Sequence, residues 1–510
     1  MSVFSRTFET SIDLHSVSIV EGVEINKNSE YDSYEYGILK ISAEKASIVT
    51  KPIFFRFTTD CSGSMSDKCK DGRTKMDHIQ HTMCNMIRFF ADSEEATIYI
   101  QVHAFDDKIH EIIPTTHVTK YNIGSLIIAI GKMYPMQSTN IELALTDASE
   151  CIAKHVVANP THSVSHIFLT DGDATAGNRD EHYLASLVKE NASSTFIAFG
   201  LTHSALTMQK LGAANSRSSN WLIDNLENAG LVYGEILNNE LFKVLEKVEI
   251  NLVGGVIYDY KKGEFVNKLY IGDLVTETQK TYHILAKDRN VSARISGIKY
   301  NNFNEDYYFG DGWAMCNKES CDLTPHIFRL RAQQYMFESK KFEHEKIPVQ
   351  RNPFIRNGNV LRRQHAVPAL QLPDTDIDAY DQFTSIEPTP LEIFKDTLRN
   401  FLKVMQKYMN ANGADNDPFM KGLCDDMYLT INSLGTRHQR MCVGARATSQ
   451  GSQQCYNVAD FDLGLDGDYA LSQTPTNNAY QTPSVMKLMR TCSAPMKRSS
   501  QSDDEQELEV

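Results

Sequence analysis

The alternation of two kinds of segment between residues 52 and 247 constrains the fold most. Short, almost continuously apolar runs alternate there with longer segments whose apolar residues recur at helical spacing. The short runs are IFFRFTTD (53–60), TIYIQVHAF (97–105), HIFLTD (166–171) and TFIAFGL (195–201). A strand that is apolar on both faces is typical of a parallel sheet covered by helices on both sides. The pattern therefore predicts a doubly wound α/β domain over residues 51–247.

Two of the longer segments have the spacing of amphipathic helices. The first runs from Thr74 to Asp92, and the second begins near Asn140 and ends before Pro160. The apolar stripe of the first comprises Met76, Ile79, Met83, Ile87 and Phe90. His78, His81 and Cys84 lie on the same helix at a spacing that could suit a transition metal, but no fourth ligand is evident. We expect both histidines on its exposed face.

The regions on either side of the α/β domain differ from it in periodicity. In residues 1–50, short stretches in which apolar and polar residues alternate predict strands. After residue 248 the spacing between apolar residues shortens towards two, which also indicates strands. We expect 248–345 to be an antiparallel β domain that ends in a helix. Because one short group of strands cannot bury itself, residues 1–50 are expected to complete that sheet.

The C-terminal third of the sequence predicts a linker, a helical region and a tail. Residues 346–388 are rich in proline and have little periodicity, which favours a linker. Residues 389–440 are predicted to form a helical region, beginning with a helical pair. Residues 441–510 are polar and end in SDDEQELEV, so we expect a largely disordered tail with one helical turn at SVMKLMR.

Charge and cysteine content exclude several classes of function. The chain has 51 Lys plus Arg against 65 Asp plus Glu, a net charge of −14, whereas a general nucleic-acid binder needs a basic surface. No run of apolar residues is long enough for a membrane-spanning helix, and the first residues do not resemble a secretory signal. Ten scattered cysteines indicate reduced thiols. We expect a cytoplasmic protein that binds neither nucleic acid nor membrane.

Oxygen-bearing side chains follow the first buried run of the α/β domain. Asp60, Ser62 and Ser64 stand two residues apart in the motif DCSGSM, on the loop at the carboxyl end of the strand. Ligands bind at this edge of an open α/β sheet, and three oxygens suit a hard divalent cation such as Mg²⁺. The alternative is a serine-rich turn that caps a helix.

Two more segments carry oxygen-bearing side chains, one at the start of a predicted helix and one at the end of a predicted strand. Thr139, in the sequence STN, is expected to open the second long helix, and Asp171, in LTDGDAT, ends another buried strand. Asp173 is expected to be a solvated turn residue, and Cys61 a packed thiol that points away from the ion. The order DCSGSM, STN, LTDGDAT along strands and helices resembles the von Willebrand factor A (VWA) domain and its metal-ion-dependent adhesion site (MIDAS).

This resemblance covers residues 50–247 and implies roles for five side chains. Ser62, Ser64 and Thr139 would coordinate Mg²⁺ or Mn²⁺, and Asp60 and Asp171 would bind it directly or through water. A protein partner would supply an Asp or Glu carboxylate at the remaining position. The pair Gln137-Ser138 departs from the family, since many members have glycines there.

The C-terminal helices at 389–434 resemble the helical region that follows VWA domains in some RING-type ubiquitin ligases and hedgehog/intein-associated proteins. No paired CxxC motif with a following Cys/His set is present, so a RING module is not expected. Cys316 and Cys321 lack two further zinc ligands and are interpreted as free thiols. A basic cluster is interpreted as a solvated linker; it consists of Arg351, Arg356, Arg362 and Arg363.

These observations favour a Mg²⁺-dependent protein-binding adaptor or scaffold. The three loops contain no histidine to act as a base, so we expect no enzyme. Two alternatives remain: a component of a ubiquitin ligase or of another metal-assisted enzyme system, and an assembly protein in which the metal only stabilises the fold.

Overall fold

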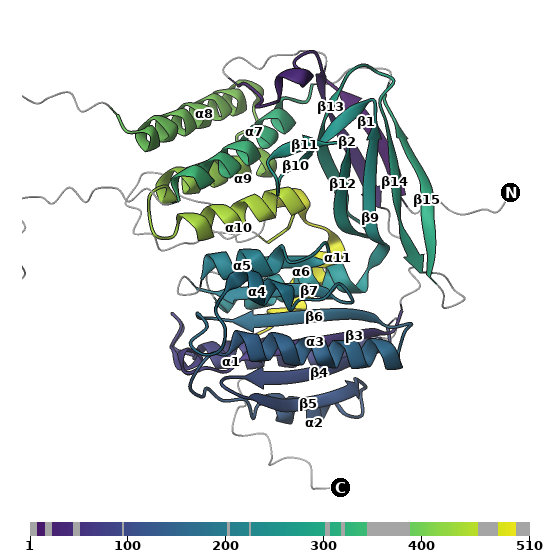
Figure 1. Cartoon of the computed structure of the whole chain (residues 1–510), viewed down its shortest axis with the longest axis vertical. Coiled ribbons are helices and arrows are strands. Elements are labelled where there is room, and N and C mark those ends of the chain that lie inside the picture. Colours follow the sequence, from purple (N-terminus) through teal and green to yellow (C-terminus); the bar gives the residue numbers. More distant parts are fainter. Residues whose placement is uncertain are drawn as a thin grey trace, which may run out of the picture.

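The computed structural model describes most of the chain. The described residues are 8–15, 23–43, 51–93, 96–200, 204–223, 226–300, 306–317, 322–343, 388–456 and 478–495. They form an α/β layer at the bottom of Figure 1, with a β domain and a group of helices above it. This arrangement confirms the predicted fold class of an α/β domain with an antiparallel β domain and a C-terminal helical region.

A six-stranded sheet is the centre of the α/β layer, with strand order β5-β4-β3-β6-β7-β8. Its strands are β3 (Ile53–Asp60), β4 (Ile98–Phe105), β5 (Ile109–His117), β6 (Ser163–Thr170), β7 (Ser193–Phe199) and β8 (Ser218–Ile223). All neighbours pair in parallel except β5, which runs antiparallel to β4 at the edge. The carboxyl ends of the parallel strands therefore meet at one edge of the sheet.

Helices cover both faces of this sheet. They are α1 (Lys75–Asp92), α2 (Ile123–Ile130), α3 (Ile141–Ala158), α4 (Glu181–Ser186), α5 (Ala205–Gly212) and α6 (Ala229–Leu241). Phe55 on β3 stacks on Phe90 of α1, with ring centroids 5.1 Å apart. Its neighbour Phe54 points to the opposite face and stacks on His155 of α3 at 3.7 Å. Successive residues of the apolar strand β3 thus pack against different helices, as a doubly covered strand requires.

Local sequence explains where α1 begins. The hydroxyl of Thr74 accepts a hydrogen bond from the N–H of Asp77, whose carboxylate accepts one from the N–H of Thr74. This reciprocal cap satisfies two amide groups that the first turn would otherwise leave unpaired. All five apolar residues predicted for the inner face of α1 are buried.

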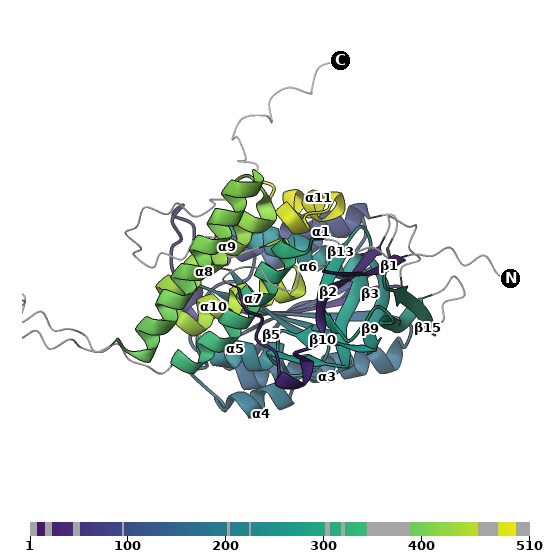
Figure 2. The ribbon, with the colours of Figure 1, turned by 90° about the horizontal axis from the view of Figure 1, so that it is seen from above.

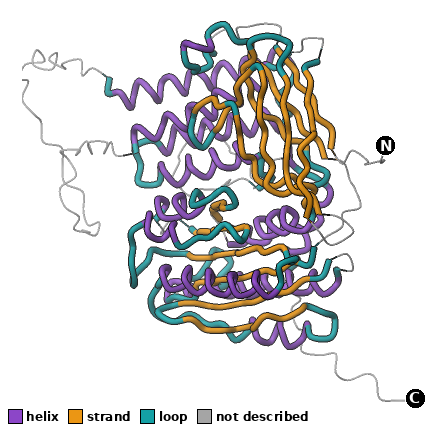
Figure 3. Tube along the Cα trace, turned by 45° about the vertical axis from the view of Figure 1, so that its right-hand side comes forward, coloured by secondary structure: helices purple, strands orange, loops and turns teal. Residues whose placement is uncertain are grey.

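Two antiparallel sheets form the β domain. The first has the order β1-β2-β13-β10-β11, with β1 (Phe8–Leu14), β2 (Glu35–Ala43), β10 (Gly255–Asp259), β11 (Glu264–Val266) and β13 (Gln279–Ala286). The second has the order β12-β9-β14-β15, with β9 (Lys243–Val253), β12 (Lys268–Val275), β14 (Ser292–Tyr300) and β15 (Asp306–Met315). Because β2 pairs with β13, the N-terminal strands share a sheet with strands that follow the α/β layer. Figure 3 shows these strands beside the helices.

Four helices pack beside the first of these sheets (Figure 2). They are α7 (Thr324–Glu338), α8 (Pro390–Asn412), α9 (Pro418–Ser433) and α10 (Gln439–Ser452). Their shared core includes Phe328 of α7, Phe401 of α8 and Met427 of α9. Residues 346–387 of the expected linker, with its arginine cluster, lie outside the described residues, as does Cys321.

The described part of residues 441–510 contains helices, whereas the sequence predicts a largely disordered tail. Helix α10 extends to Ser452, and α11 (Pro483–Cys492) occupies the place of the single expected turn. Val485, Leu488 and Met489 of α11 are buried in the core of the α/β layer. These contacts are long-range, so the polar composition of the segment does not reveal them.

Two glycines of α6 let α11 approach closely. A Cβ atom at Gly234 would lie 2.5 Å from the backbone of Met489, and one at Gly230 would lie 2.5 Å from Ser493. The next residue of α6, Glu235, is buried and accepts the N–H groups of Cys455 at 2.7 Å and Tyr456 at 2.6 Å. The C-terminal segment is thus attached to α6 at two places.

Across the described ranges, the helices are too short or too polar for any of them to cross a membrane.

We predict that Gly234→Ala destabilises the attachment of α11. The added methyl group would overpack the helix contact and cost about 1–3 kcal/mol. Hydrogen exchange should become faster at the α11 amides, and the thermal midpoint of the full chain should fall. Gly124→Ala on α2 is the matched control, because a Cβ atom there would have no neighbour within 4 Å and alanine favours a helix. Equal effects of the two substitutions would contradict the close contact.

Candidate metal centre at the edge of the sheet

Asp60 lies at the carboxyl end of β3 and is completely buried. One carboxylate oxygen accepts the N–H of Ser62 at 2.7 Å, and the other accepts the hydroxyl of Thr170 at 2.7 Å. Burial raises the pKa of Asp60 to about 6, although the bonds from Thr170 and Ser62 oppose the rise. The protein fixes this carboxylate in a place where its negative charge is costly.

Ser62, Ser64 and Asp171 form a continuous chain of oxygens next to Asp60. The hydroxyls of Ser62 and Ser64 are 3.1 Å apart, and Ser64 donates to Asp171 at 2.6 Å. Asp171 follows β6, which pairs in parallel with β3, and this pairing explains why residues so distant in sequence meet. Within the described chain, neither hydroxyl has a histidine partner.

Thr139 is buried on a loop that lies against the loop of Ser62. The N–H of Gly63 donates to the carbonyl of Gln137 at 3.1 Å, which holds the two loops together. The N–H of Thr139 donates to the hydroxyl of Thr175 at 2.8 Å, and its carbonyl accepts the N–H of Thr175 at 2.9 Å. Helix α3 begins at Ile141 with Asn140 as its cap, so Thr139 precedes the helix and does not open it.

The structure thus places all five predicted residues at one edge of the sheet. Asp173 is exposed, as expected of a solvated turn residue. The Cys61 thiol is buried and donates to the carbonyl of Phe105 at 3.1 Å, in agreement with a packed thiol.

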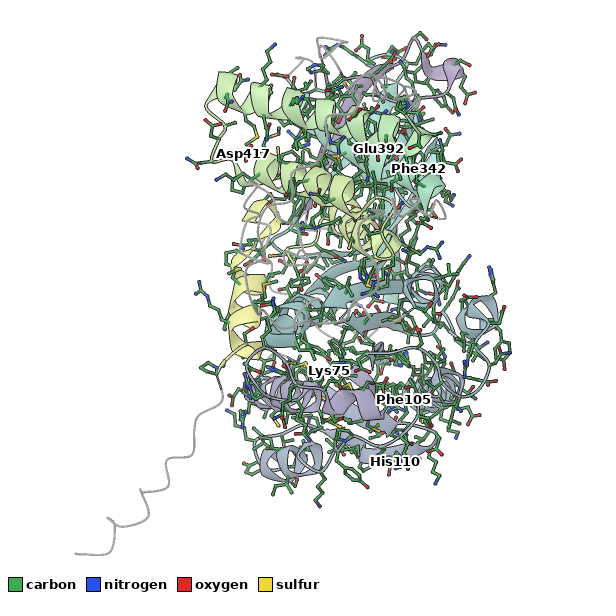
Figure 4. The ribbon with its side chains drawn as sticks, turned by 90° about the vertical axis from the view of Figure 1, so that its left-hand side faces the viewer. Lys75, Phe105, His110, Phe342, Glu392 and Asp417 are labelled. Carbon is green, nitrogen blue, oxygen red and sulfur yellow. The ribbon has the colours of Figure 1, made fainter. Side chains whose placement is uncertain are left out.

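Lys75 is a member of this site that sequence reasoning missed. Its ammonium group donates to Asp171 at 2.7 Å and lies 3.3 Å from Asp67. Burial lowers the pKa of Lys75, but the hydrogen bonds and charges of Asp171 and Asp67 outweigh burial and raise it above its ordinary value. Figure 4 shows Lys75 and Phe105 in the α/β layer, on the side towards which β4 and β6 point in Figure 1.

One sequence signal could have identified Lys75. It is the first residue of α1, where the helix dipole favours negative side chains and disfavours a lysine. A cation at such a position suggests a nearby carboxylate that compensates the unfavourable dipole. The identity of that carboxylate depends on the strand order, because Asp171 is 96 residues away.

A buried charge network separate from this edge lies between the sheet and α3. Potential ligand atoms of His103, Asp147 and Cys151 lie within 4.8 Å of one another. The Asp147 carboxylate, however, already binds the fully buried guanidinium of Arg56 and accepts from His103 at 2.8 Å. The guanidinium supplies the positive charge that a cation would otherwise bring, so we interpret the group as a structural ion-pair network.

The expectation for the histidines of α1 was wrong. His78 is buried, with its Nε2 atom 3.1 Å from Asp71, and half-buried His81 contacts the carbonyl of Ala494 at 2.7 Å. The loop before α1 and the segment after α11 cover these side chains. Helical periodicity alone therefore assigns them to the wrong environment.

No protein-family model matches the chain, and no curated protein matches it. Solved structures do resemble it. A von Willebrand factor type A protein from Catenulispora acidiphila is 13% identical, covering 66% of this chain and 80% of that chain with a TM-score of 0.46. The ArnB paralog VWA2 from Sulfolobus acidocaldarius is 11% identical. That match covers 87% of this chain and 98% of the other chain, with a TM-score of 0.46. A structure of proximal thread matrix protein 1 from the mussel byssus, which has a zinc-occupied MIDAS motif, is 15% identical. That match covers 38% of this chain and 48% of the other chain, with a TM-score of 0.30.

We predict that Lys75→Met lowers the free energy of unfolding by about 3 kcal/mol in the presence of EDTA, because it removes the cation bound to buried Asp171. Urea unfolding followed by the fluorescence of Trp221 would measure the change, with Trp313→Phe as the background. Lys70→Met is the control, since Lys70 is exposed in the preceding loop. A loss no larger than that of the control would show that the ion pair contributes little.

Proposed function

We propose that Asp60, Ser62, Ser64, Thr139 and Asp171 form a MIDAS that holds Mg²⁺ or Mn²⁺, and that the chain binds a protein partner through it. The observation that carries this proposal is the continuous set of side-chain oxygens at the carboxyl ends of β3 and β6, 2.6–3.1 Å apart. Neighbouring ligands of an octahedral Mg²⁺ ion, each about 2.1 Å from it, are separated by about 3 Å. The spacing of the oxygens of Ser62, Ser64 and Asp171 therefore suits the ion.

The charges at the site support the capture of an anion. Asp60 and Asp171 together balance the two positive charges of the ion, and the charge of Lys75 is shared with the exposed carboxylate of Asp67, 3.3 Å away. A carboxylate of the partner would then be attracted mainly by the ion itself. The amino-terminal end of α3 lies beside Thr139 and favours a negative group in the same place.

The proposed role follows that of VWA domains, which the sequence motifs resemble. Neutral hydroxyls leave the ion electrophilic, so an Asp or Glu side chain of the partner would complete its coordination. Ca²⁺ prefers more ligands at longer distances and should support binding less well than Mg²⁺. The bound ion would supply a point of attachment, and the serines would orient it.

The first test is metal binding to the full chain. The double variant Ser62→Ala/Ser64→Ala should lose Mg²⁺ binding measured by calorimetry, because it removes two of the proposed ligands. Asp173→Ala should bind like the unaltered chain, since this carboxylate is exposed. Binding of Mg²⁺ to the double variant at full affinity would eliminate the assignment of the site.

The second test is partner binding. Affinity capture from an extract of the source organism should recover a partner in Mg²⁺ and lose it in EDTA. Thr139→Ala should weaken recovery, while Asp173→Ala should leave it unchanged. If capture survives both EDTA and Thr139→Ala, this edge is not the interface, and the helical region at 389–434 becomes the next candidate.

A further inference from the structure

A cavity of about 610 Å³ lies where the α/β layer, the β domain and the helical region meet. It is lined from the α/β layer by β8 and α6, from the β domain by β10, β12 and β13, and from the helical region by α7 and the end of α10. In Figure 1, α6 of the α/β layer and α10 of the helical region meet in the middle of the molecule. The volume is within the range of about 300–1,000 Å³ that is typical of small-molecule sites.

Arg329 of α7 brings a buried positive charge to this cavity, with only 1% of its surface exposed. Its guanidinium donates to the hydroxyl of Thr281 at 2.8 Å and to the carbonyl of Gln450 at 2.8 Å. Both acceptors are neutral, and the Nε atom is buried without a hydrogen-bond partner. Within the described ranges, Arg329 forms no ion pair with a carboxylate.

Lys280 of β13 brings a second cation to the lining. Its ammonium group donates to the carbonyl of Ser452 at 3.3 Å, again a neutral acceptor. Burial lowers the pKa of Lys280, and the charges of Glu235 and Asp273 oppose the change only in part. A buried charge without an ionic partner is unfavourable, so the buried Arg329, with the half-buried Lys280 at the same cavity, needs an explanation.

The four carboxylates of the lining have other partners, and one of them, Asp259, lies 3.8 Å from Lys262. Glu240 and Asp273 both bind Lys243, at 2.7 Å and 2.9 Å. Glu235 accepts the two backbone N–H groups of the C-terminal segment described above. These interactions leave Arg329 without an ionic partner, while the charges of Glu235 and Asp273 compensate that of Lys280 only in part.

Two neutral polar groups of the lining are also unsatisfied. The hydroxyl of Tyr258 and the Nε2 atom of His283 are buried without a hydrogen-bond partner. The two side chains lie on paired strands, since β10 and β13 bring Ile257 opposite Ile284. The Nδ1 atom of His283 is 2.8 Å from the hydroxyl of Tyr36, so Nε2 remains available to a ligand.

We propose that this cavity binds a small organic anion, with its phosphate or carboxylate groups held by Arg329 and Lys280 and hydrogen-bonded by Tyr258 and His283. The proposal does not depend on the metal centre. The cavity lies at the amino ends of β7 and β8, where Ser193 and Ser218 line it, whereas the metal centre lies at the carboxyl ends of β3 and β6. Lys261 and Lys262, which also line the cavity and are exposed, would attract such a ligand from solution.

The experiment uses the full chain freed of metal ions by a chelating resin, because EDTA is itself a polycarboxylate, with inorganic pyrophosphate and citrate as separate probes for phosphate and carboxylate chemistry. We expect saturable one-to-one binding of at least one probe by calorimetry and a matching rise in the thermal midpoint. Lys280→Met should weaken binding tenfold or more. Tyr258→Phe, which removes one hydroxyl only, should weaken it about threefold while the chain stays folded.

Lys154→Met is the matched control, because Lys154 is an exposed lysine of α3 with 79% of its side chain accessible. This variant should bind the probes like the unaltered chain. The proposal is overturned if neither probe binds saturably, or if Lys280→Met and Tyr258→Phe both bind as tightly as the control.

The same experiment separates an added anion from an acidic segment of the chain itself. Residues 457–477 contain four aspartates and no lysine or arginine, and they connect the lining residues Gln454 and Tyr480. The four are Asp460, Asp462, Asp466 and Asp468. If only the variant with all four changed to Asn binds the probes, the chain supplies its own anion and the proposal of a small-molecule site is wrong.

Discussion

Because β3 and β6 pair in parallel, the carboxylates of Asp60 and Asp171 at their carboxyl ends lie at the same buried edge of the sheet. Neighbouring groups compensate their charge. Asp60 and Asp171 are both fully buried, and the charge of Asp171 contributes to the raised pKa of Asp60. Two hydroxyls, a backbone N–H and the ammonium group of Lys75 satisfy these carboxylates. These groups come from the loop after β3, from β6 and from α1, so the edge also fixes how these three segments pack.

Lys75 changes how this edge should respond to a metal ion. It already binds one of the carboxylates of the proposed metal site, so it would compete with an ion for Asp171. If Asp171 turned to the ion, the lysine would still add positive charge nearby and favour an acidic partner. One residue would then weaken metal binding and strengthen partner binding, which links the two events.

The C-terminal segment joins parts of the molecule that the chain order keeps apart. Residues Cys455 and Tyr456 bind Glu235 of α6, and α11 packs on the glycines of the same helix. Helix α10, just before, belongs to the helical region and supplies the acceptor for Arg329. The central cavity is therefore enclosed by all three parts of the structure, and its charge balance is a property of their assembly.

Much of this protein is determined by local sequence, and the rest only by its tertiary structure. The apolar run 53–60 forms β3 with the same bounds, and the α1 stripe is buried as its spacing predicts, because backbone geometry sets these periods. The order of the motifs around Asp60, Thr139 and Asp171 predicts a shared edge, since carboxyl ends of parallel strands must meet there. Composition predicts a tail after residue 440, yet α11 is buried because glycines of α6 leave room for it. The ion pair of Lys75 with Asp171 likewise joins residues that are far apart in the sequence. Arg329 has only neutral acceptors for the same reason, because its surroundings come from elements that meet only in the folded chain. No local sequence pattern predicts either environment.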